Sequence, residues 1–474
     1  MIGRINEKEI LGQCNNSGRP EFIVVYGRRR VGKTFLIKEY FNERFSFYAT
    51  GINSQNVRGQ LKAFNISLRE YGCSDTSIPK DWFEAFMRLK KVLEAKTVRR
   101  NSISGRRIVF LDELPWMDTA KSDFKSALDY FWNSWGSSQK DLMLIVCGSA
   151  TSWIINNLLA DTGGFYNRIT RRIHLAPFSL TECKELLAQN NMIMTNKQIL
   201  ETYMIFGGIP FYLNMLNSGL SLAQNVDALI FNEYGDLHYE YKNLFDSLFK
   251  NPGKHNSIID ALSKSKDGML RTELAKVKTI GDGEPLTKAL SELEECGFIR
   301  KYQDFTTPKQ GNIFQIIDPF VLFSLKCTED GGISSWENYI NSPGYYAWRG
   351  NAFEILCLNH VDVIKRILGI SGVETNAYAW RSKKTVPGAQ IDLLLDRKDG
   401  IINLCEMKFS DREYVITKQV EDDLIHKRDT FRNEANPNSA LHITLISASG
   451  VKNNEHKDVV QKVISGDDFC KYAL

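Results

Sequence analysis

The sequence predicts an α/β protein whose first part contains a parallel β-sheet, and three observations support this fold class. Short apolar runs of strand length recur at 21–26, 108–111 and 142–148. Stretches with helical spacing of apolar residues separate these runs, as in parallel sheets with helical crossovers. A glycine-rich loop directly follows the first run. Nearly continuous apolar strands are typical of parallel sheets that are covered on both faces.

Length and composition suggest about three domains in an ordinary globular protein. The chain has 474 residues, of which 43% are hydrophobic and 24% are charged, so collagen-like, low-complexity and broadly disordered classes are excluded. At about 150 residues per domain, three folded units are expected. The 60 basic and 56 acidic residues give a net charge of +4. This balance is too even to indicate a nucleic-acid partner by itself.

The nine cysteines and the N-terminal residues bear on the expected compartment. No two cysteines form a C-x-x-C pair, so neither a disulfide framework nor a zinc site is favoured. The N-terminal segment carries acidic residues where a signal peptide needs an apolar core, and no apolar stretch approaches the roughly 18 residues of a membrane span. We therefore expect a cytoplasmic protein without a membrane partner.

The first apolar run leads into a phosphate-loop pattern. The segment 27–34 fits G-x-x-x-x-G-K-[ST], and a helical stretch follows it, which is the strand–loop–helix context that this motif requires. The loop N–H groups and the helix N-terminus would cradle phosphates, Lys33 would reach the β- and γ-oxygens, and the Thr34 hydroxyl would bind Mg²⁺. The residues expected to bind ATP here are Gly27, Arg28, Arg29, Arg30, Val31, Gly32, Lys33, Thr34 and Phe35.

The second apolar run ends in two acids, in the Walker B pattern. Asp112 stands at the carboxyl end of the expected strand and would hold Mg²⁺ through water. Glu113, one residue further on, is placed to orient and deprotonate the attacking water. Two acids after a strand are ordinarily solvated loop residues, but the phosphate loop upstream favours a functional pair. Catalytic roles are therefore predicted for Lys33 and Glu113.

Two polar residues further along have alternative interpretations. Ser149 follows the apolar run 142–148 and would either sense the γ-phosphate or cap the next helix. Arg168 would act as an arginine finger in trans, or it is a solvated surface residue. The segments 45–49 and 171–175 are expected to be further strands, and 79–96 a helix.

Several segments together resemble the archaeal-type P-loop ATPases of prokaryotes, which are close to the AAA+ and STAND nucleotide switches. They are Ile2-Gly-Arg4 with Glu7, the loop 26–34, Leu111–Trp116, Gly148-Ser149 and Gly207–Pro210. The resemblance implies a five-stranded core over 1–178 and a helical lid over 179–250. It also implies that residues 2–4 and Pro210 lie near the adenine of ATP.

The middle segment, 251–330, looks like a winged helix. Helices are expected at 271–277 and 284–297, and wing strands at 298–302 and 313–316. The second helix would read DNA, yet it carries four glutamates against one lysine: Glu284, Glu292, Glu294 and Glu295 against Lys288. Because phosphates would repel that face, packing against the ATPase or a protein partner is favoured over direct DNA reading.

The last segment carries a second group of charged residues on an expected hairpin. Glu406 and Lys408 share one face of a strand, and a hairpin with 390–395 can bring Asp392 beside them. Asp392 and Glu406 could then hold Mg²⁺, while Lys408 stabilises or positions the nucleophile. The alternative is an exposed strand face with one ion pair.

With Glu354 on a preceding helix, these residues resemble the PD-(D/E)xK restriction-endonuclease-like fold over 345–474. The resemblance implies catalytic roles for Glu354, Asp392, Glu406 and Lys408. Ile391 replaces the usual proline. This segment has 18 basic and 18 acidic residues, and its local basic group is only Arg381, Lys383 and Lys384, so the nuclease fold is better supported than DNA cleavage.

The leading hypothesis is an AAA+/STAND-type ATPase that uses ATP and Mg²⁺ and is joined by a winged helix to an endonuclease-like domain acting on DNA. The alternative is a nucleotide-controlled switch whose C-terminal domain binds a partner or DNA without cutting. A DNA-binding regulator that uses the winged helix is a third interpretation, which the acidic second helix disfavours. A protein partner or a second copy of the chain is expected at the winged helix.

Overall fold

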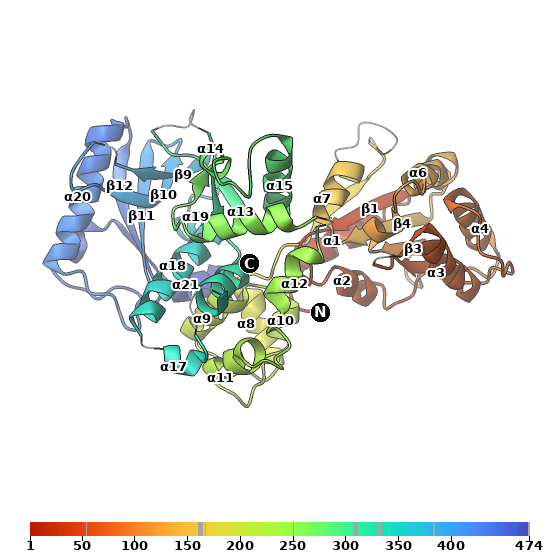
Figure 1. Cartoon of the computed structure of the whole chain (residues 1–474), viewed down its shortest axis with the longest axis horizontal. Coiled ribbons are helices and arrows are strands. Elements are labelled where there is room, and N and C mark those ends of the chain that lie inside the picture. The colour runs from red at the N-terminus through yellow and green to blue at the C-terminus, as the bar shows by residue number, and fades with distance from the viewer. Residues whose placement is uncertain are drawn as a thin grey trace. The chain divides into compact units, whose positions relative to one another are not determined.

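The computed structural model describes residues 1–53, 55–159, 165, 167–249, 251–306, 311–329, 333–340, 342–382 and 384–472. Lys383 of the expected basic group lies outside them. The chain divides into two compact units, Met1–Pro177 and Phe178–Leu474 (Figure 1). Among the helices of the described ranges, none is both long and apolar enough to cross a membrane.

The first unit is built on a five-stranded parallel sheet with the strand order β2-β3-β4-β1-β5. The strands are β1 (Glu21–Tyr26), β2 (Phe47–Thr50), β3 (Arg107–Asp112), β4 (Leu142–Gly148) and β5 (Arg171–His174). The expected α/β parallel sheet is therefore confirmed, and the bounds of β1 and β4 agree with the prediction. Strand order reverses beside β1, which places a crevice at the carboxyl ends of β1 and its neighbours.

Helices cover the sheet of the first unit. They are α1 (Ile5–Asn15), α2 (Lys33–Tyr40), α3 (Val57–Glu70), α4 (Trp82–Glu94), α5 (Leu114–Met117), α6 (Phe124–Ser134) and α7 (Thr151–Ile154), the last continued by a π-helical segment, Ile155–Leu159. α4 begins later than expected because the Asp81 carboxylate accepts a hydrogen bond from the Glu84 N–H and so caps the helix. Trp82, Phe86 and Phe124 pack in one aromatic cluster between α4 and α6.

The second unit begins with helices and continues into a small sheet. The helices are α8 (Leu180–Gln189), α9 (Asn196–Phe206), α10 (Pro210–Leu213), α11 (Leu222–Val226), α12 (Glu240–Asp246), α13 (Gly253–Ser263), α14 (Arg271–Leu274) and α15 (Glu284–Glu295), with a π-helical segment at Asp227–Phe231. The antiparallel sheet has the order β6-β8-β7, from β6 (Met269–Leu270), β7 (Ile299–Tyr302) and β8 (Ile313–Ile316). The helix expected at 271–277 is thus shorter than predicted.

A mixed five-stranded sheet forms the C-terminal part, with the order β13-β12-β11-β10-β9. Its strands are β9 (Thr375–Arg381), β10 (Gln390–Arg397), β11 (Ile401–Lys408), β12 (Ala440–Ser447) and β13 (Lys462–Ser465); the helices are α16 (Pro319–Phe323), α17 (Trp336–Tyr339), α18 (Pro343–Asn359), α19 (Val361–Ile367), α20 (Lys418–Ala435) and α21 (Gly466–Tyr472), with a π-helical segment at Ser324–Glu329 and a short 3-10 helix at Lys457–Val459. Phe431 of α20 packs on Trp380 of β9, and α18 lies against β11 (Figure 1).

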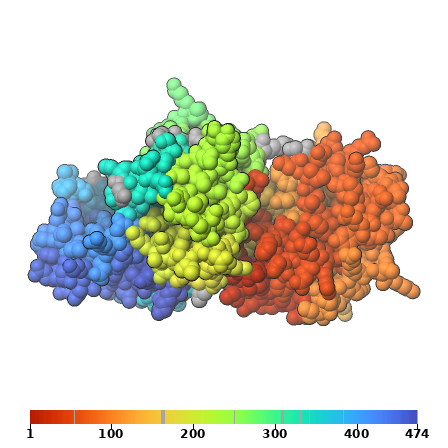
Figure 2. All heavy atoms as spheres, turned by 90° about the horizontal axis from the view of Figure 1, so that it is seen from below, coloured from red at the N-terminus to blue at the C-terminus, as the bar shows by residue number. Residues whose placement is uncertain are grey.

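The C-terminal helix returns to the first helices of the second unit. The Thr181 hydroxyl donates a 3.1 Å hydrogen bond to the Cys470 carbonyl, and the Asn196 amide donates to Asp467 over 2.7 Å. Figure 2 shows the yellow residues that begin this unit beside the blue C-terminal residues. Residues 271 and 289 positions apart in the sequence are therefore packed in one body.

Replacing Trp82 tests the aromatic cluster. Trp82 is fully buried, whereas the neighbouring Phe83 is 42% exposed. We expect Trp82→Ala to lower the free energy of unfolding of the first unit by about 3–5 kcal/mol, because it leaves a cavity. The matched variant Phe83→Ala should cost less than about 1 kcal/mol. Native-state hydrogen exchange of the β1 and β4 amides measures both; similar losses would contradict the assigned packing.

Candidate nucleotide site and nuclease-like site

The phosphate loop joins β1 to α2 through backbone conformations that suit glycine. Gly27 and Gly32 have φ angles of 140° and 92°, and Arg30 has 69°. A Cβ atom on Gly27 would lie 2.3 Å from the carbonyl oxygen of Leu175, so no larger residue fits there without moving β5. The glycines that the motif requires thus set the turn between strand and helix.

Lys33 is the first residue of α2 and is buried within the loop. Its ammonium group donates hydrogen bonds of 2.9 Å to the carbonyl oxygens of Gly27 and Arg28. Val31 and Arg28 are buried as well, whereas Phe35, which was expected to bind nucleotide, is 59% exposed on α2. The lysine is therefore held where the loop N–H groups and the start of α2 converge.

The two residues expected to bind Mg²⁺ meet at the carboxyl end of the sheet. The Thr34 hydroxyl donates a 2.9 Å hydrogen bond to Oδ2 of Asp112, and Asp112 is the last residue of β3. A hydroxyl and a carboxylate at this separation can serve one hard cation, which prefers oxygen ligands. These residues fit a Mg²⁺ ion that accompanies a nucleotide.

Cys147 supports Asp112, and the motif analysis did not identify it. The thiol, fully buried on β4, donates a 2.6 Å hydrogen bond to Oδ1 of Asp112. Burial and the negative charge of Asp112 raise the pKa of the Cys147 thiol, which therefore remains a protonated donor. The sequence signal that could have identified Cys147 is its position two residues before Ser149, on the strand that lies beside β3.

Glu113 and Ser149 form the next contact along this edge. Glu113 has a left-handed backbone with φ 46°, and its Oε2 accepts hydrogen bonds of 3.1 Å and 2.9 Å from the Ser149 N–H and hydroxyl. Ser149 does not cap α7, because Ala150 is the N-cap residue and no side chain caps the helix. The helix-cap alternative is wrong. A γ-phosphate contact by Ser149 stays a prediction.

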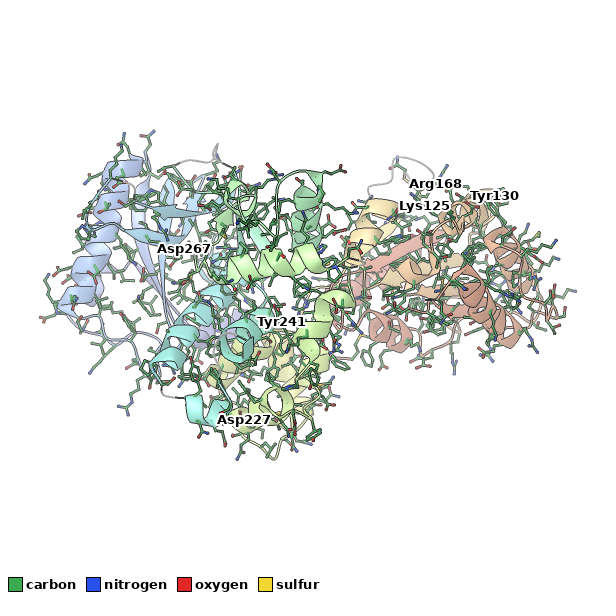
Figure 3. All side chains as sticks on the ribbon, viewed as in Figure 1. Lys125, Tyr130, Arg168, Asp227, Tyr241 and Asp267 are labelled. Atoms are coloured by element: carbon green, nitrogen blue, oxygen red, sulfur yellow. The ribbon has the colours of Figure 1, made fainter. Side chains whose placement is uncertain are left out.

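The N-terminal segment reaches the phosphate loop through Arg4. Its guanidinium donates to the Val31 carbonyl over 3.0 Å and to the Ala176 carbonyl over 2.8 Å. The loop is thereby tied both to the N-terminus and to the chain after β5. Arg168, labelled in Figure 3, has an exposed side chain, and its role in trans stays a prediction.

In the C-terminal part, the structure forms the expected hairpin. β10 pairs antiparallel with β11, including Leu393 opposite Cys405. Asp392 lies on β10, whereas Glu406 and Lys408 lie on β11. Glu354 comes from α18 and is buried.

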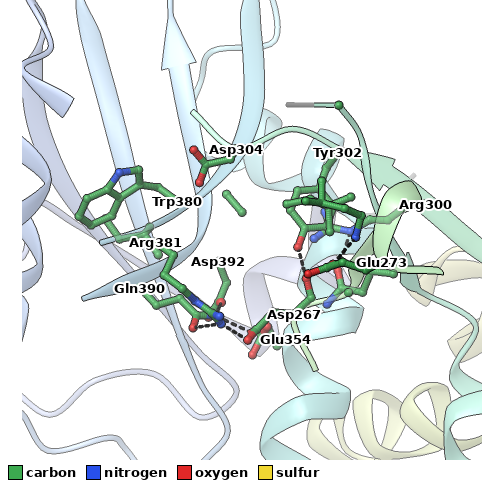
Figure 4. Close-up of a pocket in the computed structure, with 17 residues that line it drawn as sticks. Asp267, Glu273, Arg300, Tyr302, Asp304, Glu354, Trp380, Arg381, Gln390 and Asp392 are labelled. Atoms are coloured by element: carbon green, nitrogen blue, oxygen red, sulfur yellow. Dashed lines mark hydrogen bonds and ion pairs between the residues drawn. The ribbon is translucent and has the colours of Figure 1, made fainter. Parts of the chain in front are cut away.

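Glu354 and Asp392 line a cavity of about 310 Å³ (Figure 4). Lys266, in the turn between α13 and β6, places its ammonium 2.8 Å from Oε2 of Glu354. Burial and the charge of Asp392 raise the pKa of Glu354 to about 7. The side-chain amide of Gln390 donates a 2.6 Å hydrogen bond to Asp392.

Glu406 has different partners. Its carboxylate lies 2.8 Å from the Lys408 ammonium and 2.6 Å from that of Lys427 on α20. Burial disfavours the charged form of Glu406, but the two ammonium groups outweigh it and hold the pKa of this carboxyl below its usual range. The structure thus differs from the alternative of one compensating ion pair, because a second lysine also pairs with Glu406.

The expected meeting of Asp392 and Glu406 at one cation stays a prediction. Within the part of the chain that the structure describes, no three His, Cys, Asp or Glu side chains form a group that could hold a metal ion. The pairs between β10 and β11 end at Leu393, and the register with β9 shifts between Ile391 and Leu394. This irregularity lies between β10 and β9 and leaves the β10–β11 register, with Leu393 opposite Cys405, unchanged. A Mg²⁺ ion shared by all three of Glu354, Asp392 and Glu406 does not fit this arrangement, and a two-acid site at Asp392 stays a prediction.

Comparisons with known proteins support the resemblance to ATPases that was expected for the first part of the chain. Residues 3–216 match a family described as an ATPase domain predominantly from Archaea. The uncharacterized protein MJECL04 of Methanocaldococcus jannaschii is 24% identical over 440 residues, covering 90% of this chain and 91% of that protein. The uncharacterized ATP-binding protein MJ0423 of the same organism is 41% identical over 44 residues, or 9% of this chain and 75% of that protein.

A solved structure shows the same fold. The Walker-type ATPase PABY2304 of Pyrococcus abyssi superposes with a TM-score of 0.50 at 18% identity, covering 69% of this chain and 96% of that one. This likeness shows that the fold resembles that of this ATPase, and residues 3–216 are similar to the archaeal-type ATPase domain family.

The contact between Cys147 and Asp112 can be tested by substitution. Cys147→Ala removes the only thiol at Asp112 and should lower the unfolding free energy of the first unit by about 1–3 kcal/mol, because a buried acceptor loses a donor. Cys147→Ser keeps a donor and should lose less. Urea unfolding, monitored by hydrogen exchange of the β3 and β4 amides, measures the difference in unfolding free energy between the two variants. Equal losses would show that packing, and not the hydrogen bond, matters at this position.

Proposed function

We propose that the chain hydrolyses ATP with Mg²⁺ as cofactor at the phosphate loop of its ATPase domain. The observation that carries this proposal is the meeting of Thr34, Asp112 and Glu113 at the carboxyl ends of β1 and β3. Ligands bind at this edge of open α/β sheets. Both the start of a helix and a buried lysine point to phosphate as the group that is bound.

Each residue of this site has a distinct task in the proposed reaction. Lys33 exchanges the carbonyl oxygens of its own loop for the β- and γ-phosphate oxygens. Thr34 and Asp112 hold Mg²⁺, which neutralises charge on the phosphates when it is bound. Glu113 takes a proton from the attacking water. Ser149 orients the Glu113 carboxylate through two hydrogen bonds.

Lys33→Ala tests the proposed ATPase activity. Removing the ammonium should weaken ATP binding and reduce hydrolysis to background, because the β- and γ-oxygens lose their cationic partner. A phosphate-release assay and binding of a fluorescent ATP analogue measure the two effects. The control is Lys62→Ala, which removes an exposed lysine from α3. Hydrolysis at the normal rate by Lys33→Ala would contradict the proposed site.

Glu113→Gln separates hydrolysis from binding. The amide cannot accept the proton of the attacking water, so the hydrolysis rate should fall by about 10²–10⁴-fold. ATP affinity should change little, because the proposed phosphate contacts come from other residues. Single-turnover hydrolysis and equilibrium binding measure this separation. A parallel loss of both would place Glu113 among the binding residues instead.

For the C-terminal part, we infer a PD-(D/E)xK endonuclease-like domain over 345–474 that acts on DNA, preceded by a winged helix over 251–330. Support comes from the order of the elements: Glu354 on α18, then Asp392 and Glu406-x-Lys408 on two adjacent antiparallel strands. Further support is the pair of helices with a strand hairpin at α14, α15, β7 and β8. The boundaries 1–178 and 179–250 for the ATPase core and lid belong to the same proposal.

One observation favours the alternative, a nucleotide-controlled switch that binds without cutting. Glu354 and Glu406 are paired with lysines, and no group of three or more acidic, His or Cys side chains that could hold a metal ion forms in the described residues. On α15, Glu292 accepts from His255 over 2.8 Å and Glu294 pairs with Lys301 over 3.1 Å. These contacts support packing or a protein partner, including a second copy of the chain, over DNA reading by α15.

Nicking of supercoiled plasmid in the presence of Mg²⁺ decides between cutting and binding. An active nuclease should lose nicking in Asp392→Ala, whereas Asp362→Ala, which removes an acid of α19, should retain it. Nicking that survives Asp392→Ala would come from a contaminant. Salt-dependent DNA binding without nicking, together with slow ATP turnover and retained ADP, would support the switch.

A further inference from the structure

The turn between α13 and β6 contacts the nuclease-like site with two oppositely charged side chains. We call residues 264–268 the Lys266 turn. The Lys266 ammonium lies 2.8 Å from Glu354. Asp267 forms an ion pair with Arg381 and accepts a 2.7 Å hydrogen bond from the Gln390 amide. Figure 4 shows Asp267 pointing toward Arg381 and Gln390, beside Glu354 and Asp392.

The conformation of this turn is fixed by the small sheet and does not depend on Glu354. Gly268 has φ 75°, and a Cβ atom there would lie 2.4 Å from the Phe314 carbonyl oxygen. The Ser265 hydroxyl donates to the Gly268 carbonyl over 2.6 Å, and the buried Gln315 amide donates to the Lys266 carbonyl over 2.7 Å. A turn held this firmly presents Lys266 and Asp267 in a preset direction.

The two side chains of the Lys266 turn pair with an acid and with a base of the nuclease-like site. Lys266 brings a positive charge to within 2.8 Å of Glu354, which lines the same cavity as Asp392. An ammonium is a compact point charge, so it satisfies the carboxylates that a divalent cation would otherwise satisfy. Asp267 pairs with Arg381, which belongs to the one local basic group that the sequence shows in this segment.

We infer that the Lys266 turn is an autoinhibitory element: Lys266 occupies the cation position at Glu354 and Asp392, and Asp267 masks Arg381. This inference rests on the nuclease-like function proposed for the C-terminal domain. Cation binding at the acids and engagement of a DNA phosphate by Arg381 both require the turn to move away.

The test measures Mn²⁺ binding to the full chain without nucleotide, by titration calorimetry. Lys266→Met should raise the Mn²⁺ affinity by at least about tenfold, because it removes a positive charge from the cation position. The gain should disappear in the double variant Lys266→Met with Asp392→Asn. That double variant also separates this site from Thr34 and Asp112 of the first unit.

The matched control is Lys264→Met in the same turn. Lys264 lies 2.9 Å from Asp260 in an exposed pair on α13, so its loss should leave Mn²⁺ affinity unchanged. Lys266→Gln is the second variant, because it keeps a hydrogen-bond donor for Glu354 without the charge. It should reproduce the gain even if Lys266→Met destabilises the fold, as judged by circular dichroism.

Equal Mn²⁺ affinity in the wild type and in folded Lys266 variants would overturn the inference. An equal gain in Lys264→Met would overturn it too, since any loss of positive charge would then suffice. Mn²⁺ bound at Asp392 in Lys266→Gln without plasmid nicking would uphold the blocked cation position and reject the proposed nuclease activity. New nicking in Lys266→Gln that Asp392→Asn abolishes would support both.

Discussion

The carboxylate of Asp112 is the point on which the nucleotide site depends. It is 4% exposed and accepts hydrogen bonds from the Thr34 hydroxyl, the Cys147 thiol and the Glu113 N–H. A buried charge is tolerated only with such partners. Because the three donors come from α2, β4 and the chain after β3, one carboxylate fixes the relative positions of the phosphate loop, β4 and the proposed base.

Much of the first unit could be predicted because its signals are local. Apolar runs of strand length gave β1 and β4 at their observed bounds, and the loop motif needed only its flanking strand and helix. The contacts that could not be predicted join residues distant in the sequence. Cys147 meets Asp112 only because β4 lies beside β3, and Ser149 contacts Glu113 across the same edge instead of capping α7, whose N-cap residue is Ala150.

The C-terminal site shows where sequence periodicity stops being a guide. Alternation along β11 correctly places Glu406 near Lys408, which it contacts over 2.8 Å. On the other side of the hairpin, the register between β9 and β10 shifts beside Asp392. A strand pattern carries no signal for such a shift, which depends on how three strands meet. The hairpin was predictable, whereas the lysines that reach its site from other elements were not.

The even charge balance of the C-terminal part also takes a different meaning in three dimensions. Counted along the sequence, equal numbers of acids and bases merely argued against a DNA surface. In the structure, the charges of the candidate site are paired individually: Lys427 from α20 reaches Glu406, and Lys266 from before β6 reaches Glu354. Each of these lysines is remote in sequence from the acid that it neutralises. A site can therefore be suppressed electrostatically by residues that no local motif includes. A segment whose charges sum to zero can still contain a strongly acidic pocket once one turn is displaced.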